Sequence, residues 1–134
     1  MSESRKEHVT QQPEAAPGEV EEAARTLVPA TSAGMPPTAQ AFWAVVNSDG
    51  TLARGFGAVA TSRLALGQYQ VTFSHDVSRS GFVAAQGFTG SLGVPADGTA
   101  VVVGRAGVPA AVFVATYNSA GALSDRAFHL AILA

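Results

Sequence analysis

From Ala39 to the end of the chain, short apolar runs rich in Val, Phe and Ala alternate with glycine. Twelve glycines fall in these 96 residues, and most of them separate runs of five to eight residues. Such runs are typical of β-strands, because β-branched and aromatic side chains fit a half-buried pleated surface. We expect strands over residues 42–47, 51–60, 68–74, 81–86, 100–104, 110–118 and 127–133, with a further short strand near 88–92. No segment after residue 40 shows a helical period with caps.

Two of these runs alternate cleanly between apolar and polar residues. Tyr69, Val71 and Phe73 share one face of the first run, and Phe128, Leu130 and Ile132 share one face of the last. Alternation of this kind belongs to strands with one face on the core. The fold class predicted is therefore all-β, a single antiparallel β-sandwich or jelly roll over residues 39–134.

Residues 1–38 differ in composition from the rest. They hold five of the seven prolines, six of the ten acidic residues and no aromatic residue. A segment like this buries too little apolar surface to offset its chain entropy, so we expect a disordered acidic tail. Residues 19–27 (EVEEAARTL) have the composition of a short helix, either a frayed turn in the tail or a docking stub.

The pattern F-x-A-x-x-N-S-x-G-x-L occurs twice, at residues 42–52 and 113–123. Each copy predicts a β-hairpin, in which Asn and Gly supply the positive φ angles that a tight turn needs. Two copies are too few for a propeller or a solenoid.

Several motifs associated with catalysis or cofactors lack the context that their chemistry needs. GFGAVA at residues 55–60 fits a dinucleotide fingerprint, but a strand follows it instead of a helix, so the glycines favour close strand packing. Ser74, His75 and Asp76 are the three residue types of a hydrolytic triad, yet neighbours on a strand point to opposite faces, and Asp76 fits a bend better. There is no Cys, and the three His residues are far apart. We therefore predict no catalytic residue, cofactor or metal site.

Four residues are candidates for ligand binding or an interface. Trp43, Tyr69 and Tyr117 could form an aromatic platform for a sugar, although half-buried rings on strands more often belong to a core. His129 lies between two apolar residues of the last run, where it would occupy a β-face or a subunit interface.

Residues 39–134 contain five Arg, four Asp, and neither Lys nor Glu. That is about 9% charged residues, against roughly 25% in ordinary soluble domains. A monomer with so few charges would expose apolar patches, so we expect a homo-oligomer held by an apolar interface. The net charge of −2 offers no basic surface for nucleic acid. No apolar run is long enough to span a membrane as a helix, and no signal peptide is visible, so we expect a cytoplasmic protein or a component of a phage-like particle.

Three segments mark the start, middle and end of the domain: AFWA at residues 41–44, GQYQVTF at 67–73 and FHLAIL at 128–133. In these segments the domain resembles the C1q/TNF-like jelly roll found at the tips of bacterial collagen-like proteins and some phage tail fibres. This resemblance implies a non-enzymatic trimer that presents loops to a protein or glycan. The alternative function is a small-ligand or carbohydrate-binding β-sandwich that uses Trp43 and the Tyr residues.

Deletion of residues 1–36 should leave the thermal midpoint of the domain within a few degrees, because the segment contains no aromatic residue and little that could belong to a core. Circular dichroism melts of the full and shortened chains would measure this. Loss of the folded state on deletion would contradict it.

Overall fold

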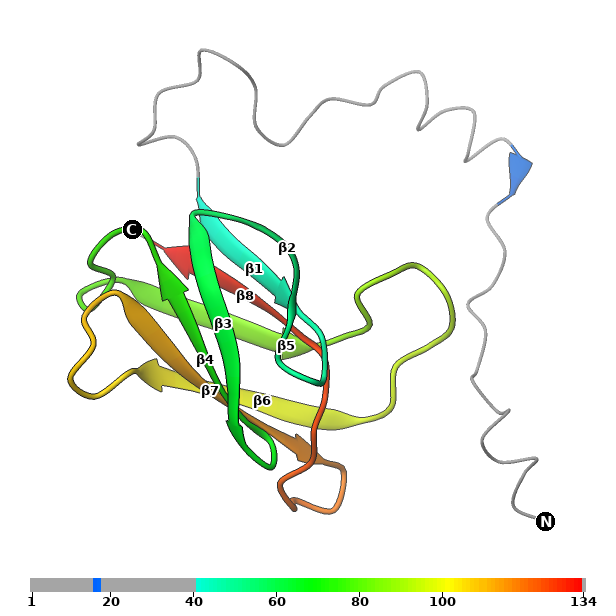
Figure 1. Ribbon diagram of the computed structural model, residues 1–134. Helices are drawn as coiled ribbons and strands as arrows, with labels where there is room; N and C mark the ends of the chain where they lie inside the picture. The colour runs from blue at the N-terminus through cyan, green and yellow to red at the C-terminus, as the bar shows by residue number, and fades with distance from the viewer. Residues whose placement is uncertain (1–15, 18–40, 134) are drawn as a thin grey trace.

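The computed structural model describes residues 16–17 and 41–133. Within 41–133 every regular element is a β-strand (Figure 1). The strands are β1 (Phe42–Val46), β2 (Leu52–Phe56), β3 (Ala58–Ala65), β4 (Gln68–Phe73), β5 (Gly81–Gln86), β6 (Gly98–Gly104), β7 (Ala111–Asn118) and β8 (Phe128–Leu133). They form two four-stranded antiparallel sheets, in the orders β2-β1-β8-β5 and β3-β4-β7-β6. The expected antiparallel β-sandwich is confirmed. The tail expected over residues 1–38, with its helix at 19–27, lies outside the described residues except for residues 16 and 17.

The core lies between the two sheets and contains the side chains that alternation assigned to it. Tyr69, Val71 and Phe73 point inward from β4. Phe128, Leu130 and Ile132 point inward from β8. The rings of Tyr69 and Phe128 pack with their centroids 5.1 Å apart. Strand β8 lies between β1 and β5, so it is central to its sheet.

The run expected as one strand over residues 51–60 is two strands that belong to different sheets. Gly57 separates β2 from β3 with a φ of 80°, and β3 then continues to Ala65. A Cβ at Gly57 would lie 2.7 Å from Cδ1 of Phe42, so both the backbone conformation and the space require glycine. Gly55 is equally confined, because a Cβ there would lie 2.6 Å from the Trp43 carbonyl oxygen. The glycines of GFGAVA therefore permit close strand packing, as expected.

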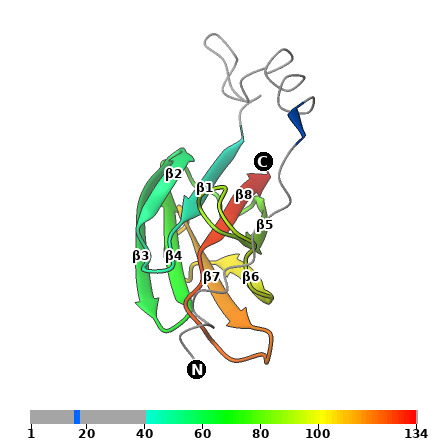
Figure 2. The ribbon, with the colours of Figure 1, turned by 90° about the vertical axis from the view of Figure 1, so that its right-hand side faces the viewer.

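The short strand expected near residues 88–92 is wrong, because this segment is part of the loop that joins β5 to β6. The carbonyl oxygens of Phe88 and Thr89 face side chains of the neighbouring sheet instead of a strand. Nε2 of His129 lies 3.0 Å from the Phe88 oxygen, and Nη1 of Arg54 donates to the Thr89 oxygen at 2.6 Å. Figure 2 shows the loop passing in front of β1 and β8. These bonds hold the loop against the outer face of the β2-β1-β8-β5 sheet.

Phe128→Ala should lower the free energy of unfolding by about 3–5 kcal/mol, because it removes a fully buried ring from the centre of the core. Urea denaturation would measure the change. Phe88→Ala is the matched control, since Phe88 is 42% exposed. Equal losses in the two variants would contradict the assigned core.

Candidate interaction surface

The sequence makes Tyr69 a candidate for ligand binding or an interface, but it is wholly inaccessible to solvent and belongs to the core. It faces the core because β4 alternates, and Gln68 and Gln70 take the outer face. Its hydroxyl donates to the Ser48 carbonyl oxygen at 2.7 Å. Burial, and then the charge of Asp125, raise the pKa of Tyr69 above its usual value. This residue joins the core to a loop.

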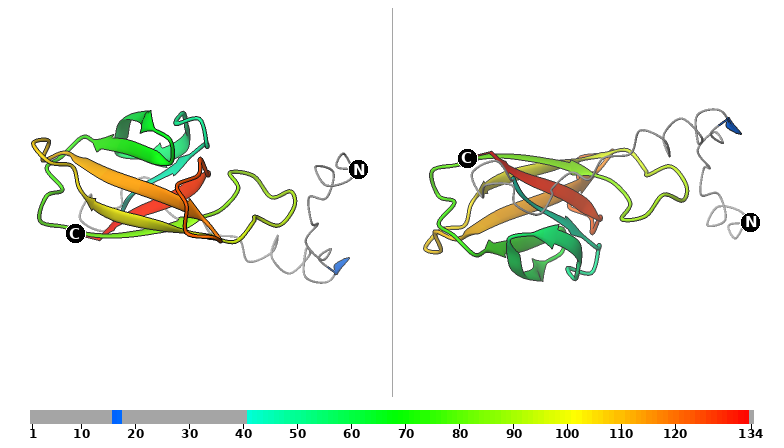
Figure 3. Two further views of the ribbon diagram at one scale, coloured as in Figure 1. Left: turned by 90° about the horizontal axis from the view of Figure 1, so that it is seen from below. Right: turned by 90° about the horizontal axis from the view of Figure 1, so that it is seen from above.

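Trp43 and Tyr117 do not lie on one face, so these residues do not form the aromatic platform of the alternative interpretation. Trp43 alternates with the inward-facing Phe42 and Ala44 of β1 and therefore lies on the outer face of its sheet. Tyr117 lies opposite Thr99, on the outer face of the other sheet. The two outer faces point away from each other across the sandwich (Figure 3).

His129 lies on the outer face of β8, opposite Val45 on one side and Ala85 on the other. It is partly buried, and the edge of its ring lies 3.3 Å from where a Cβ of Gly87 would be. Its described partner is the Phe88 carbonyl, so it supports the β5–β6 loop.

The repeated pattern forms two turns with the same backbone hydrogen bonds. In the first turn, the Asn47 N–H donates to the Thr51 oxygen and the Gly50 N–H donates to the Asn47 oxygen. In the second turn, the Asn118 N–H donates to the Ala122 oxygen and the Gly121 N–H donates to the Asn118 oxygen. Only the glycines have positive φ, 94° and 84°, so the expectation that Asn would share that role is wrong. The asparagines act through their side chains. Oδ1 of Asn118, for example, accepts from the Ala120 N–H at 2.9 Å.

Asp125 connects loops through its hydrogen bonds. It belongs to the β7–β8 connection, which lies with the β3–β4 turn at the end of the sandwich opposite the start of β1 (Figure 1). Its carboxylate accepts from Gly67 N at 2.7 Å and from Nε of Arg63 at 3.0 Å. The Gly67 bond, with smaller contributions from Arg63 and Tyr69, lowers the pKa of Asp125 below its usual value. Asp125 lies in the β7–β8 loop and Gly67 in the β3–β4 turn, and Tyr69 bonds Ser48 of the β1–β2 turn. The Gly67 oxygen also accepts from the Thr116 N–H, so these three loops are held together.

Ser74 and His75 interact, although adjacent strand residues were expected to diverge. Ser74 Oγ lies 2.9 Å from Nδ1 of His75, which is geometrically allowed because β4 ends at Phe73. Asp76 takes no part in this pair. Its Oδ1 accepts from the N–H and the hydroxyl of Ser78 at 2.9 and 2.7 Å, as expected for a residue that stabilises a bend. The three residues therefore do not form a triad.

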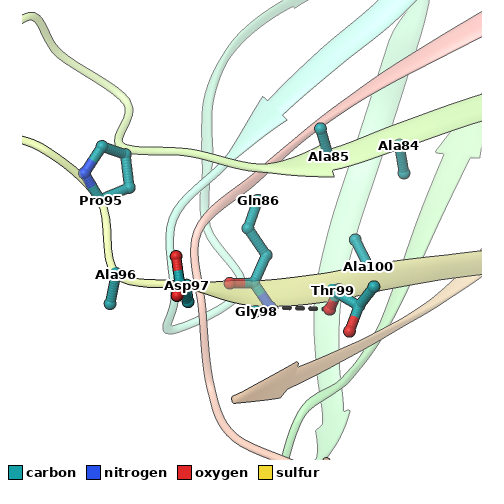
Figure 4. A pocket seen from close by; sticks show the side chains of 9 residues that line it. All are labelled: Ala84, Ala85, Gln86, Pro95, Ala96, Asp97, Gly98, Thr99 and Ala100. Atoms are coloured by element: carbon teal, nitrogen blue, oxygen red, sulfur yellow. Dashed lines mark hydrogen bonds between the residues drawn. The ribbon is translucent and has the colours of Figure 1, made fainter. Parts of the chain in front are cut away.

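An open pocket of about 410 Å³ lies between the end of β5 and the start of β6 (Figure 4). Most of its lining side chains are small, and Asp97 is the charged residue among them. Nε2 of Gln86 bridges the strands by donating to the carbonyl oxygens of Thr99 and Tyr117 at 2.7 and 2.6 Å. Oε1 of Gln86 is buried and has no hydrogen-bond partner among the described residues. Within 41–133, no three His, Asp or Glu side chains come together as metal ligands.

The outer surface divides sharply by charge. Among the eight described strands, the only Arg, Lys, Asp or Glu residues are Arg54 in β2 and Arg63 in β3. Twelve large apolar side chains are nevertheless at least 36% exposed. They are Leu52, Val59, Leu64, Leu66, Val83, Phe88, Leu92, Val94, Val101, Val103, Val108 and Leu133. Sequence reasoning anticipated this shortage of charge but did not identify these residues, because an apolar residue type does not by itself show whether the side chain is buried.

Comparison with protein-family models, with curated proteins and with solved structures gave no match. No helix of the described residues is long and apolar enough to cross a membrane. Functional interpretation therefore depends on the residues themselves.

The charge of Asp125 should stabilise the fold above about pH 4, the usual range of an aspartate, and this contribution should vanish as the pH falls through the lowered pKa. Asp125→Asn keeps the shape of the side chain and removes the charge. We expect the wild type to be more stable than this variant at pH 7, and the difference to shrink below about pH 4. Urea denaturation at several pH values would measure it.

Asp97→Asn, at an exposed position, is the control for a lost surface carboxylate. Asp49 and Asp76 also have lowered pKa values, so the comparison must be between variant and wild type at each pH. A stability difference for Asp125→Asn that is independent of pH would contradict the assigned role.

Proposed function

We propose that this chain is a non-enzymatic structural or recognition module that assembles with copies of itself and presents loops to a protein or glycan. The observation that carries the proposal is the exposure of twelve large apolar side chains on a domain with nine charged residues. Monomeric proteins rarely leave large apolar patches in water, and association of identical subunits covers them. A trimer is the order that the C1q-like resemblance implies.

The loops at the Asp125 end are suited to presentation. Ser48, Asp49, Ser119 and Ala120 are exposed at the tips of the two matching turns. The hydrogen bonds of Tyr69 and Asp125 hold the bases of these loops to one another. A surface fixed in this way loses little conformational entropy when a partner binds.

Two other function classes receive less support from the geometry. Binding of a sugar by Trp43 and the tyrosines would need rings on one face, whereas Tyr69 is buried and Tyr117 is on the other sheet. Hydrolysis by Ser74 and His75 would need an acid that orients the histidine, and Asp76 is bonded to Ser78.

Light scattering of the full chain at micromolar concentration, in about 0.1 M and about 1 M salt, tests the proposal. We expect a mass that is a small multiple of 13.6 kDa in both solutions, because salt screens charge pairs and leaves apolar contacts intact. A monodisperse monomer in both solutions would overturn the proposed self-assembly.

A further inference from the structure

The sandwich has two corners at which the free edges of its sheets approach each other, and they differ in charge. At one corner β2 continues into β3 through Gly57, and each of these strands carries an arginine. At the other corner β5 and β6 lie side by side (Figures 1 and 3), joined by the bonds of Gln86 to Thr99 and Tyr117. Neither β5 nor β6 contains a charged residue or a proline. Charge and proline are the usual protection of an edge strand against another chain.

Apolar side chains point outward at the uncharged corner. Val83 of β5 is 55% exposed and lies beside Ala131 of β8, and Val101 and Val103 of β6 are 47% and 59% exposed. The register places Val103 beside Phe113 of β7, on the same outer face. Leu133, 53% exposed, lies opposite Gly81, where no side chain covers it. We call Val83, Val101, Val103 and Leu133 the apolar corner.

The loop between β5 and β6 extends this surface. Phe88, Leu92 and Val94 are 42%, 75% and 40% exposed, so the corner and its loop together hold seven of the twelve exposed large apolar residues. Val83 and Leu133 lie on the outer face of one sheet and Val101 and Val103 on the outer face of the other, so a partner has to pack around the edge where β5 and β6 meet. A stable interface buries about 800 Å² on each partner, so the loop has to contribute if the corner is an interface.

Charge distinguishes between the two nearest candidates to cover this surface. Residues 1–38 precede β1, which is two strands away from β5 in its sheet, and they hold six acidic and three basic residues. Strands β5 and β6 offer those acidic groups no charged partner, since Arg79 and Arg105 lie beyond the strand ends, and burying acidic groups against the strands would cost free energy. A second copy brings a surface of the same uncharged, apolar character. Arg105 directly follows β6, at the edge of the corner, and its Nε donates to Oε1 of Gln70 at 2.6 Å.

We propose that the apolar corner and the adjoining loop are covered by a second copy of this chain. The proposal rests on the self-assembly proposed above and assigns it to one surface. The mass of the assembly would report whether the corner meets itself, in a dimer, or another face of the next copy, in a trimer.

Two matched valines test this assignment. Val103 on β6 and Val59 on β3 are 59% and 62% exposed, both on edge strands, but at opposite corners. The variants are Val103→Lys, Val83→Lys, their combination, and Val59→Lys as the control, each made in the full chain. Light scattering over a range of concentrations would give the masses, and circular dichroism would check that each variant is folded.

We expect the combined variant to be a folded monomer at concentrations where the wild type and Val59→Lys are assembled. An assembled combined variant would overturn the corner and leave the self-assembly in place. Dissociation by Val59→Lys instead would move the interface to the arginine-bearing corner. A monomeric wild type would overturn both proposals. If deletion of residues 1–40 dissociated the assembly while the corner variants did not, the tail would be the assembling element and the corner would be wrong.

A measurement on the wild type covers the case in which the combined variant fails to fold. Amide hydrogen exchange at high and low protein concentration should show protection that grows with concentration in residues 81–86 and 98–104 but not in 52–65. Equal changes in both regions would contradict the proposal.

Discussion

Burial of the Tyr69 hydroxyl is the constraint on which much of this sandwich depends. The ring lies at the centre of the core against Phe128, and a phenol placed there needs a hydrogen-bond partner. The Ser48 carbonyl supplies the partner at 2.7 Å, which fixes the β1–β2 turn over the end of the core. Asp125 of the β7–β8 loop lies nearby and accepts from the N–H of Gly67 in the β3–β4 turn, so this loop is held at the same place. The hydrogen bonds of Tyr69 and Asp125 together connect the three loops to one another.

The shortage of charge acts differently in the interior and on the surface. In the interior, a lack of charged residues is ordinary, because the inward faces of the central strand pairs β1–β8 and β4–β7 have to be apolar in any sandwich. Outside, the position of the two arginines in the strands makes the molecule asymmetric. Arg54 and Arg63 are also used internally, to hold the Thr89 carbonyl and Asp125. Strands β5 and β6 have no equivalent charged residue.

The alternation of apolar residues predicted most of the strands and the inward faces of β4 and β8. It could not predict the division at Gly57, because a glycine in an extended run does not show whether the chain continues in one sheet or passes to another. It also mistook part of the β5–β6 loop for a strand, since Phe88 and Leu92 are apolar although both are exposed. The aromatic platform failed for a related reason. Trp43 and Tyr117 occupy strands of different sheets, and sheet order depends on long-range pairing that no local pattern records.

The loop cluster and the apolar corner use different parts of the same fold. The Asp125 cluster lies in loops beyond the ends of the strands, whereas the corner lies along β5 and β6. In the assembly that we propose, a partner copy packed along the strands would leave the strand ends accessible, so assembly and presentation would not compete for surface. Repetition of the loop cluster in an assembly would also raise the effective concentration of weak contacts to a multivalent partner. A small domain with short, rigid loops could in this way bind firmly without any deep pocket.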